Sequence, residues 1–200
     1  RKGQHMTDVA FDDRRLDADH GAICTMPDQT FGYFGWPSVT AMDDGALVAA
    51  ASGLRLSHVD PCGRTVLLHS HDDGETWSPP RVINDSPFDD RDAGLTPLGG
   101  QSLLVSWFVS DTRVYFPDGP DDRPMPDAAA RDALARGLDL QRQCDAVSRR
   151  FIGSWVRRSD DGGLTFAPPV RVAVTAPHGP ICLSGGRLLY LGKHFGDAIE

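Results

Sequence analysis

Two histidines have the spacing of a possible metal-ligand pair. His69 and His71 are separated by one residue in a stretch that predicts a strand, so both side chains fall on one strand face just before a turn. Imidazoles in this arrangement can bind zinc. Because no third ligand stands nearby in the sequence, we expect two strand-edge histidines and no metal site.

The four cysteines could also carry metal or redox chemistry, but their spacing does not favour it. They lie far apart and form no Cys-x-x-Cys pair, which is the spacing typical of zinc and redox sites. Free and mostly buried thiols suit a reducing compartment. The four positions are Cys24, Cys62, Cys144 and Cys182.

Carboxylates occur at two loop positions that follow predicted strands. Asp60 precedes Pro61, and on the residues alone an Asp-Pro pair indicates the start of a turn. Residues 89–92 read Asp-Asp-Arg-Asp, a charge cluster typical of a solvated loop.

Composition excludes some classes of protein. The chain has 28 acidic and 20 basic residues and a net charge of −8, which argues against a nucleic-acid surface. No apolar run is long enough to span a bilayer, and no signal-peptide pattern is visible. Residues 1–5 resemble a vector scar ahead of Met6. We therefore expect a cytoplasmic protein, or a secreted one if a signal has been removed.

An eight-residue pattern occurs twice and predicts the architecture that must position these groups. SHDDGETW begins at position 70 and SDDGGLTF at position 159, and each is followed by a Pro-Pro pair and Arg-Val. Internal repeats of this kind identify a repeated β unit. The aspartate can close an Asx-type turn, the glycine supplies a positive φ, and the aromatic residue packs on the sheet. We assign structural roles to Ser70, Asp72, Gly74, Thr76, Trp77, Ser159, Asp161, Gly163, Thr165 and Phe166.

The spacing of the repeats predicts β-propeller blades of four short strands. Gly-led apolar strands begin near positions 45, 100 and 186. The second unit is longer because it contains an insertion at about 117–147, in which Asp127 is the expected N-cap and Leu134, Leu138 and Gln141 show helical spacing. Without it, each unit has about 50–55 residues, close to one blade.

These units define the expected fold class and domain organisation. We expect an all-β chain with blades at about 34–84 and 92–174, and a third beginning near 179. Two and a half blades cannot close a ring, since open blades leave strand edges exposed. We therefore expect residues 6–200 to be the N-terminal part of one longer propeller domain.

Together, these features resemble the sialidase (neuraminidase) superfamily, whose repeated turns are called Asp-boxes. The resemblance covers nearly the whole chain. It includes the segment 34–39, FGWPSV, then an Asp-Gly turn and a strand ending at Arg55, and the entry to the third unit at 178–183, HGPICL. It implies a six-bladed propeller with an active site at the centre of one face.

The resemblance also implies the roles of particular residues. Asp60 matches the loop aspartate that serves as acid/base, and Asp92 matches a residue that contacts the sugar's substituents. Arg55 and Arg91 would place or support the substrate, and Trp36 could stack on a sugar ring. No metal or organic cofactor is required. The nucleophilic tyrosine, its glutamate and the remaining arginines would lie in later blades.

One departure from the family pattern bears on the substrate. Gly35 stands where sialidases have the first of three arginines that grip the substrate carboxylate, and glycine cannot replace that guanidinium. Arg64, Arg91 and Arg113 are the available replacements.

Three functions therefore stay open. The first is an exo-α-sialidase-like glycoside hydrolase that removes a terminal sialic acid or related sugar acid from a glycan. The second is a non-catalytic propeller that binds a glycan or a protein. The third is an enzyme of the same fold that acts on a different sugar acid. The sequence leaves the oligomeric state undefined.

Overall fold

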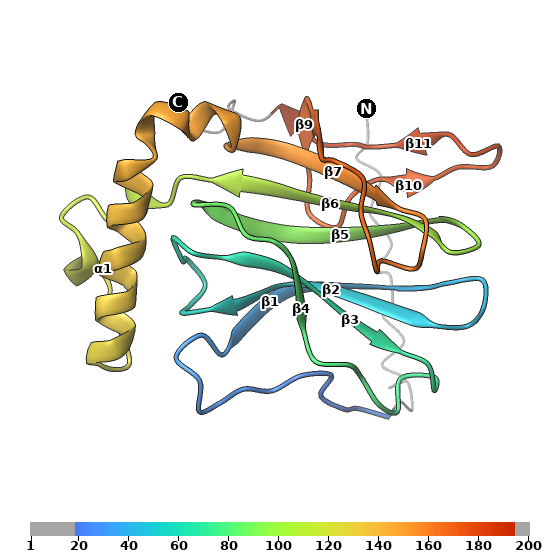
Figure 1. Ribbon diagram of the computed structural model, residues 1–200, viewed down its shortest axis with the longest axis horizontal. Helices are drawn as coiled ribbons and strands as arrows, with labels where there is room; N and C mark the ends of the chain where they lie inside the picture. Colours follow the sequence, from blue (N-terminus) through green and yellow to red (C-terminus); the bar gives the residue numbers. More distant parts are fainter. Residues whose placement is uncertain (1–18, 195–200) are drawn as a thin grey trace, which may run out of the picture.

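The computed structural model describes residues 19–194, so the predicted vector scar at 1–5 lies outside the described residues. Within these residues the fold is mostly β, with antiparallel sheets packed against one another and one α-helix at their end (Figure 1). In this part of the chain, no helix is long and apolar enough to cross a membrane.

Two four-stranded sheets follow the chain in sequence order, as the repeat predicts for blades. The first sheet consists of β1 (Tyr33–Ala41), β2 (Leu47–Arg55), β3 (Arg64–Ser70) and β4 (Arg81–Asn84). The second sheet consists of β5 (Asp89–Gly99), β6 (Ser102–Ser110), β7 (Gly153–Ser159) and β8 (Val170–Val172). The second begins three positions earlier than predicted, because Asp89 already pairs with Ser110.

The remaining strands form two short pairs. β10 (Ile181–Cys182) pairs with β11 (Leu188–Leu189), which matches the predicted start of a third unit. β9 (Val174–Thr175) pairs with β12 (Lys193–His194), a pairing that the repeat did not predict. The Thr96 hydroxyl donates to the Pro180 carbonyl at 2.5 Å and so ties the third unit to β5.

The insertion lies between β6 and β7. It contains 3₁₀ turns η1 (Arg113–Tyr115), η2 (Pro120–Asp122) and η3 (Asp145–Arg150), and helix α1 (Ala128–Gln143). The Asp127 carboxylate accepts the Ala130 N–H at 2.8 Å, which confirms the predicted N-cap. The buried face of α1 carries Leu134, Leu138 and Gln141, as their spacing predicts.

Helix α1 packs on the loop between β2 and β3. Leu56 and Val59 of that loop share an apolar cluster with the buried leucines of α1. The Gln141 side-chain amide donates to the Pro61 carbonyl at 3.0 Å, and a side chain at Gly137 would lie 2.6 Å from the Pro61 ring. The helix therefore holds this loop firmly against the end of the first sheet.

Both repeated turns have the same internal hydrogen bonds. In the first, Asp72 accepts the Thr76 N–H at 2.9 Å and the Thr76 hydroxyl at 2.5 Å, while Ser70 accepts the Gly74 N–H at 2.9 Å. In the second, the equivalent distances are 2.8, 2.5 and 2.8 Å. The serine and threonine hydroxyls thus close the turn on the aspartate rather than tying the flanking strands together.

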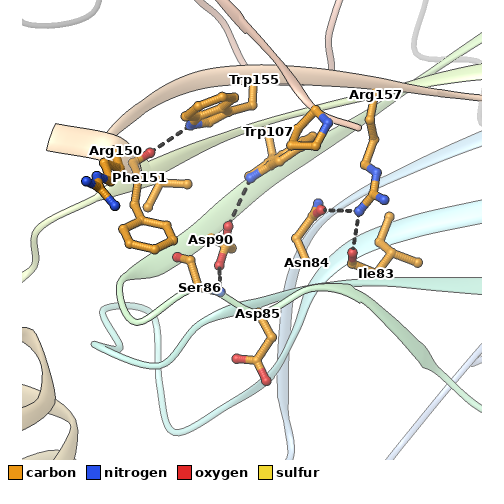
Figure 2. A pocket seen from close by; sticks show the side chains of 12 residues that line it. Ile83, Asn84, Asp85, Ser86, Asp90, Trp107, Arg150, Phe151, Trp155 and Arg157 are labelled. Carbon is orange, nitrogen blue, oxygen red and sulfur yellow. Dashed lines mark hydrogen bonds between the residues drawn. The ribbon is translucent and has the colours of Figure 1, made fainter. Parts of the chain in front are cut away.

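The two sheets pack face to face through an apolar core. Its largest fully buried members are Leu67, Phe88, Leu103 and Val105. Toward one edge of this interface, Arg157 on β7 donates to the Ile83 carbonyl on β4 at 2.8 Å (Figure 2). The second repeated turn reaches the first sheet as well, since Arg81 donates to the Gly163 carbonyl.

Candidate functional site

Four of the predicted site residues meet where β2 ends and β5 begins. The Arg91 guanidinium lies 4.6 Å from the Trp36 ring centre, and the Arg55 guanidinium lies 5.4 Å from it. Asp92 follows Arg91 directly. The His58 ring, which the sequence did not assign to the site, lies 4.7 Å from the Trp36 ring. An indole in contact with two cations is thus the centre of the site.

Irregular backbone aims these side chains. Trp36 has φ +52° and Asp92 has φ +56°, a left-handed conformation that costs free energy for residues other than glycine. Each lies at a shift in strand register, between Gly35 and Ser38 in β1 and between Arg91 and Gly94 in β5. Bulges of this kind redirect side chains and are common beside functional sites.

The Arg55 guanidinium makes its hydrogen bonds to groups within the protein. Its Nη1 and Nη2 atoms donate to the two carboxylate oxygens of Asp89 at 2.6 and 3.0 Å, and both side chains are fully buried. Further N–H groups donate to the carbonyls of Ser57 and His58. We therefore expect Arg55 to support the site rather than to touch a ligand. The sequence did not identify Asp89 as its partner.

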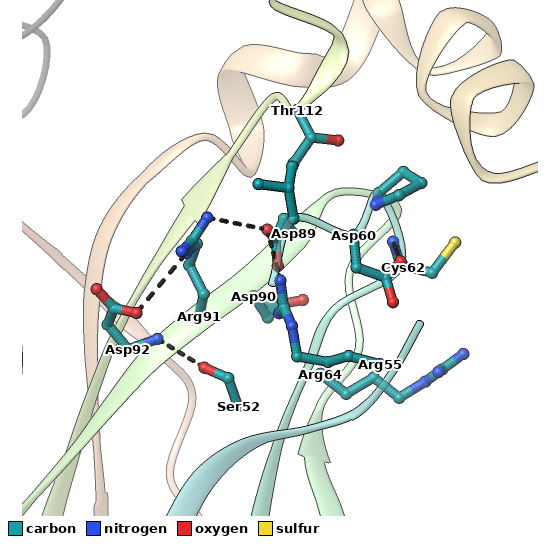
Figure 3. A network of polar contacts seen from close by, with 12 residues as sticks. Ser52, Arg55, Asp60, Cys62, Arg64, Asp89, Asp90, Arg91, Asp92 and Thr112 are labelled. Atoms are coloured by element: carbon teal, nitrogen blue, oxygen red, sulfur yellow. Dashed lines mark hydrogen bonds and ion pairs between the residues drawn. The ribbon is translucent and has the colours of Figure 1, made fainter. Parts of the chain in front are cut away.

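Arg91 and Asp92 form an ion pair with each other (Figure 3) that leaves one buried polar atom on each without a hydrogen bond from the described residues. Arg91 Nη1 lies 3.5 Å from Asp89, and Arg91 Nε lies 3.7 Å from Asp92 Oδ1. Neither Arg91 Nε nor Asp92 Oδ1 has a hydrogen-bond partner among residues 19–194. Burial raises the pKa of Asp92 above its ordinary value. A hydroxyl group can accept from the first atom and donate to the second.

Asp60 closes its own loop. Its Oδ2 accepts the Leu56 N–H at 2.5 Å and its Oδ1 accepts the Cys62 N–H at 2.7 Å. The side chain is fully buried, and burial raises its pKa. This is the turn that the Asp-Pro pair indicates. The acid/base role, which rests on the family resemblance, stays a prediction.

The place of the missing arginine is occupied. A side chain at Gly35 would lie 3.2 Å from the Tyr33 ring, so the tyrosine covers the position from which an arginine would extend. The Tyr33 ring also meets the Trp36 ring edge-on, with 6.4 Å between centres. Of the replacements considered, only Arg91 stacks on Trp36; Arg64 pairs with Asp85 instead.

The other candidate groups lie elsewhere. His69 Nε2 is 2.8 Å from the Gly162 carbonyl oxygen, so it joins the first sheet to the second repeated turn. Arg113 pairs with Asp111 and Asp145 at the insertion. The cysteines are free, but none is fully buried, which corrects the prediction of mostly buried thiols: Cys182 is exposed and the others are half-buried.

Comparison with solved structures gives likenesses of fold. A protein of unknown function from Dyadobacter fermentans is 24% identical, with a TM-score of 0.51 over 80% of this chain and 46% of that one. The Hadza microbial sialidase Hz136 is 16% identical, with a TM-score of 0.50 over 78% of this chain and 31% of that one. The intramolecular trans-sialidase from Ruminococcus gnavus, in complex with oseltamivir carboxylate, is 15% identical, with a TM-score of 0.49 over 76% of this chain and 51% of that one.

The chain thus spans about half or less of the length of these structures. No protein-family model and no curated protein matches the sequence. At these identities the likeness concerns fold alone, and the fold it supports is sialidase-like and propeller-like.

Proposed function

We propose that this chain forms part of a sialidase-like glycoside hydrolase that acts on a terminal sialic acid or a related sugar acid. We also propose that further blades complete a six-bladed ring around this site. The site would bind the sugar between Trp36, Arg91 and Asp92, without a metal or organic cofactor.

The observation that carries this proposal is that Arg91 Nε and Asp92 Oδ1, which form an ion pair at 3.7 Å, both lack a hydrogen bond within the described part of the chain. A buried donor or acceptor without a partner costs about 1–3 kcal/mol. A vicinal hydroxyl or a carboxylate of a bound sugar acid would recover that cost at Arg91 Nε, and a sugar hydroxyl would do so at Asp92 Oδ1. Trp36 beside them offers an apolar surface to the ring of a sugar.

The proposal keeps Asp60 as the acid, with one structural requirement. General acid catalysis needs the proton within hydrogen-bond reach of the leaving oxygen, although ligand-free geometry does not exclude a candidate. The raised pKa of Asp60 suits an acid. Because α1 holds the loop at Pro61, the loop must move away from α1 before Asp60 can reach a substrate. Asp92, whose Oδ1 accepts no hydrogen bond from residues 19–194, is the alternative carboxyl group.

Two features favour the alternatives. The Tyr33 ring covers Gly35, where a carboxylate-binding arginine would stand, which favours a different sugar acid. The two hydrogen bonds that occupy the Asp60 carboxylate favour a glycan-binding propeller without catalysis. Binding and hydrolysis must therefore be measured separately.

The binding experiment uses the indole N–H signal of Trp36 in two-dimensional nitrogen–proton NMR. We expect a saturable shift on titration with N-acetylneuraminate. Arg91→Gln should weaken this binding at least tenfold, since it removes a charge-assisted contact. Arg158→Gln, which replaces an exposed arginine on β7, should leave it unchanged. No shift at Trp36 from any of a panel of sugar acids would contradict the site.

A further inference from the structure

A cavity lies between the first and second sheets, on the other side of β5 from the candidate site. Its volume is about 330 Å³, within the range of small-molecule sites. Asp90 faces it, whereas its neighbours Asp89 and Arg91 face the candidate site, as alternation along a strand requires. Its walls are aromatic and polar: Trp107, Phe151, Trp155, Asn84, Arg157 and Arg150 (Figure 2).

Arg157 is a half-buried cation without a carboxylate partner among residues 19–194. Its Nη1 donates to the Ile83 carbonyl at 2.8 Å and to Asn84 Oδ1 at 3.0 Å, and its guanidinium stacks on the Phe166 ring at 4.7 Å. Burial lowers the pKa of this guanidinium. An unneutralised charge that is removed from water is costly, and a bound anion would offset that cost.

Two residues that line the cavity also carry buried donors without a hydrogen bond to any described residue. Arg157 Nε and Asn84 Nδ2 have no hydrogen-bond partner within the described part of the chain, and Asn84 is only 9% exposed. The Asn84 amide orientation follows from Arg157, which needs an acceptor at Oδ1. Both orphan groups are N–H donors, so the missing partner is an acceptor.

The acidic groups nearby are already engaged. Asp90 accepts the Trp107 indole N–H at 2.9 Å and the Ser86 N–H at 2.6 Å, and Asp85 pairs with Arg64. Arg150 adds a second cation at the rim. The cavity therefore offers cationic and donor groups beside flat indole surfaces.

We infer that this cavity between β4 and β7 is a binding site for a small organic carboxylate, with the carboxylate held by Arg157 and Asn84 and the carbon skeleton against Trp155. This site is separate from the candidate active site, and its occupant need not be a substrate.

The four tryptophans allow the two sites to be observed separately. Trp107 and Trp155 line the cavity, Trp36 lies in the candidate active site, and Trp77 lies in the first repeated turn. We would titrate the full chain with D-glucuronate at constant ionic strength and follow the four indole N–H signals, assigned by Trp→Phe variants. D-Glucose and inorganic phosphate serve as comparison ligands.

We expect saturable shifts of the Trp107 and Trp155 signals with glucuronate, weaker shifts with phosphate and none with glucose, whatever Trp36 does. Arg157→Gln should weaken the binding at least tenfold, and Arg158→Gln, on the opposite face of β7, should not. If the Trp36 signal alone fails to shift, the result counts against the proposed function and leaves this inference standing. If the Trp107 and Trp155 signals fail to shift, the result counts against this inference.

Asn84→Asp provides a test that does not rely on a weakened fold. It keeps an acceptor for Arg157 and places the missing negative charge beside it. We expect higher thermal stability together with loss of glucuronate binding. Unshifted Trp107 and Trp155 signals in the folded protein, equal shifts with glucose or phosphate, or intact binding in Asn84→Asp would overturn the inference.

Discussion

The Arg55 guanidinium and the Asp89 carboxylate form a two-point ion pair that joins the end of β2 to the start of β5, with both side chains fully buried. A side chain at Gly63 would lie within 2.0 Å of both partners, so the backbone closes over the pair. This pair fixes the spacing of the two sheets beneath Trp36 and Arg91.

Breaking this pair should destabilise the protein strongly. Removal of one member of a buried ion pair leaves an uncompensated charge and costs about 3–5 kcal/mol. We predict losses of this size for Arg55→Met and for Asp89→Leu, measured by urea unfolding. The double variant should lose less than the sum of the two. Additive losses would show that the two side chains act independently.

The stability of the protein should depend on pH through Asp90. Burial raises its pKa to about 7, above the ordinary value of 3.8. The folded state thus favours the neutral carboxyl, so this contribution is complete below pH 3.8 and is lost as pH rises through 7. We predict that the unfolding free energy of the wild type, measured relative to that of Asp90→Asn, falls as the pH rises from 5 to 8. A difference that stays constant over this range would contradict the assignment.

The second repeated turn should contribute at neutral pH and fail in acid. Hydrogen bonds from Thr165, its hydroxyl above all, lower the pKa of Asp161 to about 2 from 3.8. This contribution is complete above pH 3.8 and is lost as pH falls toward 2. We predict a lower melting temperature for Asp161→Ala at pH 7, with a deficit that narrows in acid. Glu75→Ala, at an exposed turn position, is the control. If it lowers the melting temperature as much as Asp161→Ala does, the stabilising role of Asp161 is contradicted.

Gln141 should hold the Asp60 loop closed. Gln141→Met removes the hydrogen bond to the Pro61 carbonyl and leaves that acceptor unpaired, at a cost of about 1–3 kcal/mol. We predict faster hydrogen exchange at the Leu56 and Cys62 amides, both of which donate to Asp60. Unchanged exchange at these two amides would show that α1 does not restrain the loop.

Most of what could be predicted about the fold came from the two repeated turns. Their hydrogen bonds are local, so the positions of serine, aspartate, glycine and threonine specify them directly. The start of α1 followed from the Asp127 cap and its buried face from the spacing of its leucines, for the same reason, whereas its end at Gln143 was not predicted. The pairing of β9 with β12 was missed because it joins two-residue strands that are separated in the chain by the β10–β11 pair.

The candidate site was predictable only in part. Family resemblance brought together Arg55, Arg91, Asp92 and Trp36, but their partners depend on contacts across the two sheets. The pairing of Arg55 with Asp89, 34 positions away, leaves no local pattern in the sequence. The same holds for the Tyr33 ring over Gly35 and for the cavity at Arg157.

The central claim is glycoside hydrolysis at the candidate site, and its most direct test is release of the fluorophore from a fluorogenic sialic acid glycoside by the full-length protein. We predict release by the wild type and a loss of about 10²–10⁴-fold in Asp60→Asn, with Asp92→Asn as the comparison and thermal unfolding as the check on folding. Near-normal release by a folded Asp60→Asn would remove Asp60 as the acid. No release by the folded wild type, from this substrate or from other sugar-acid glycosides, would contradict the hydrolase.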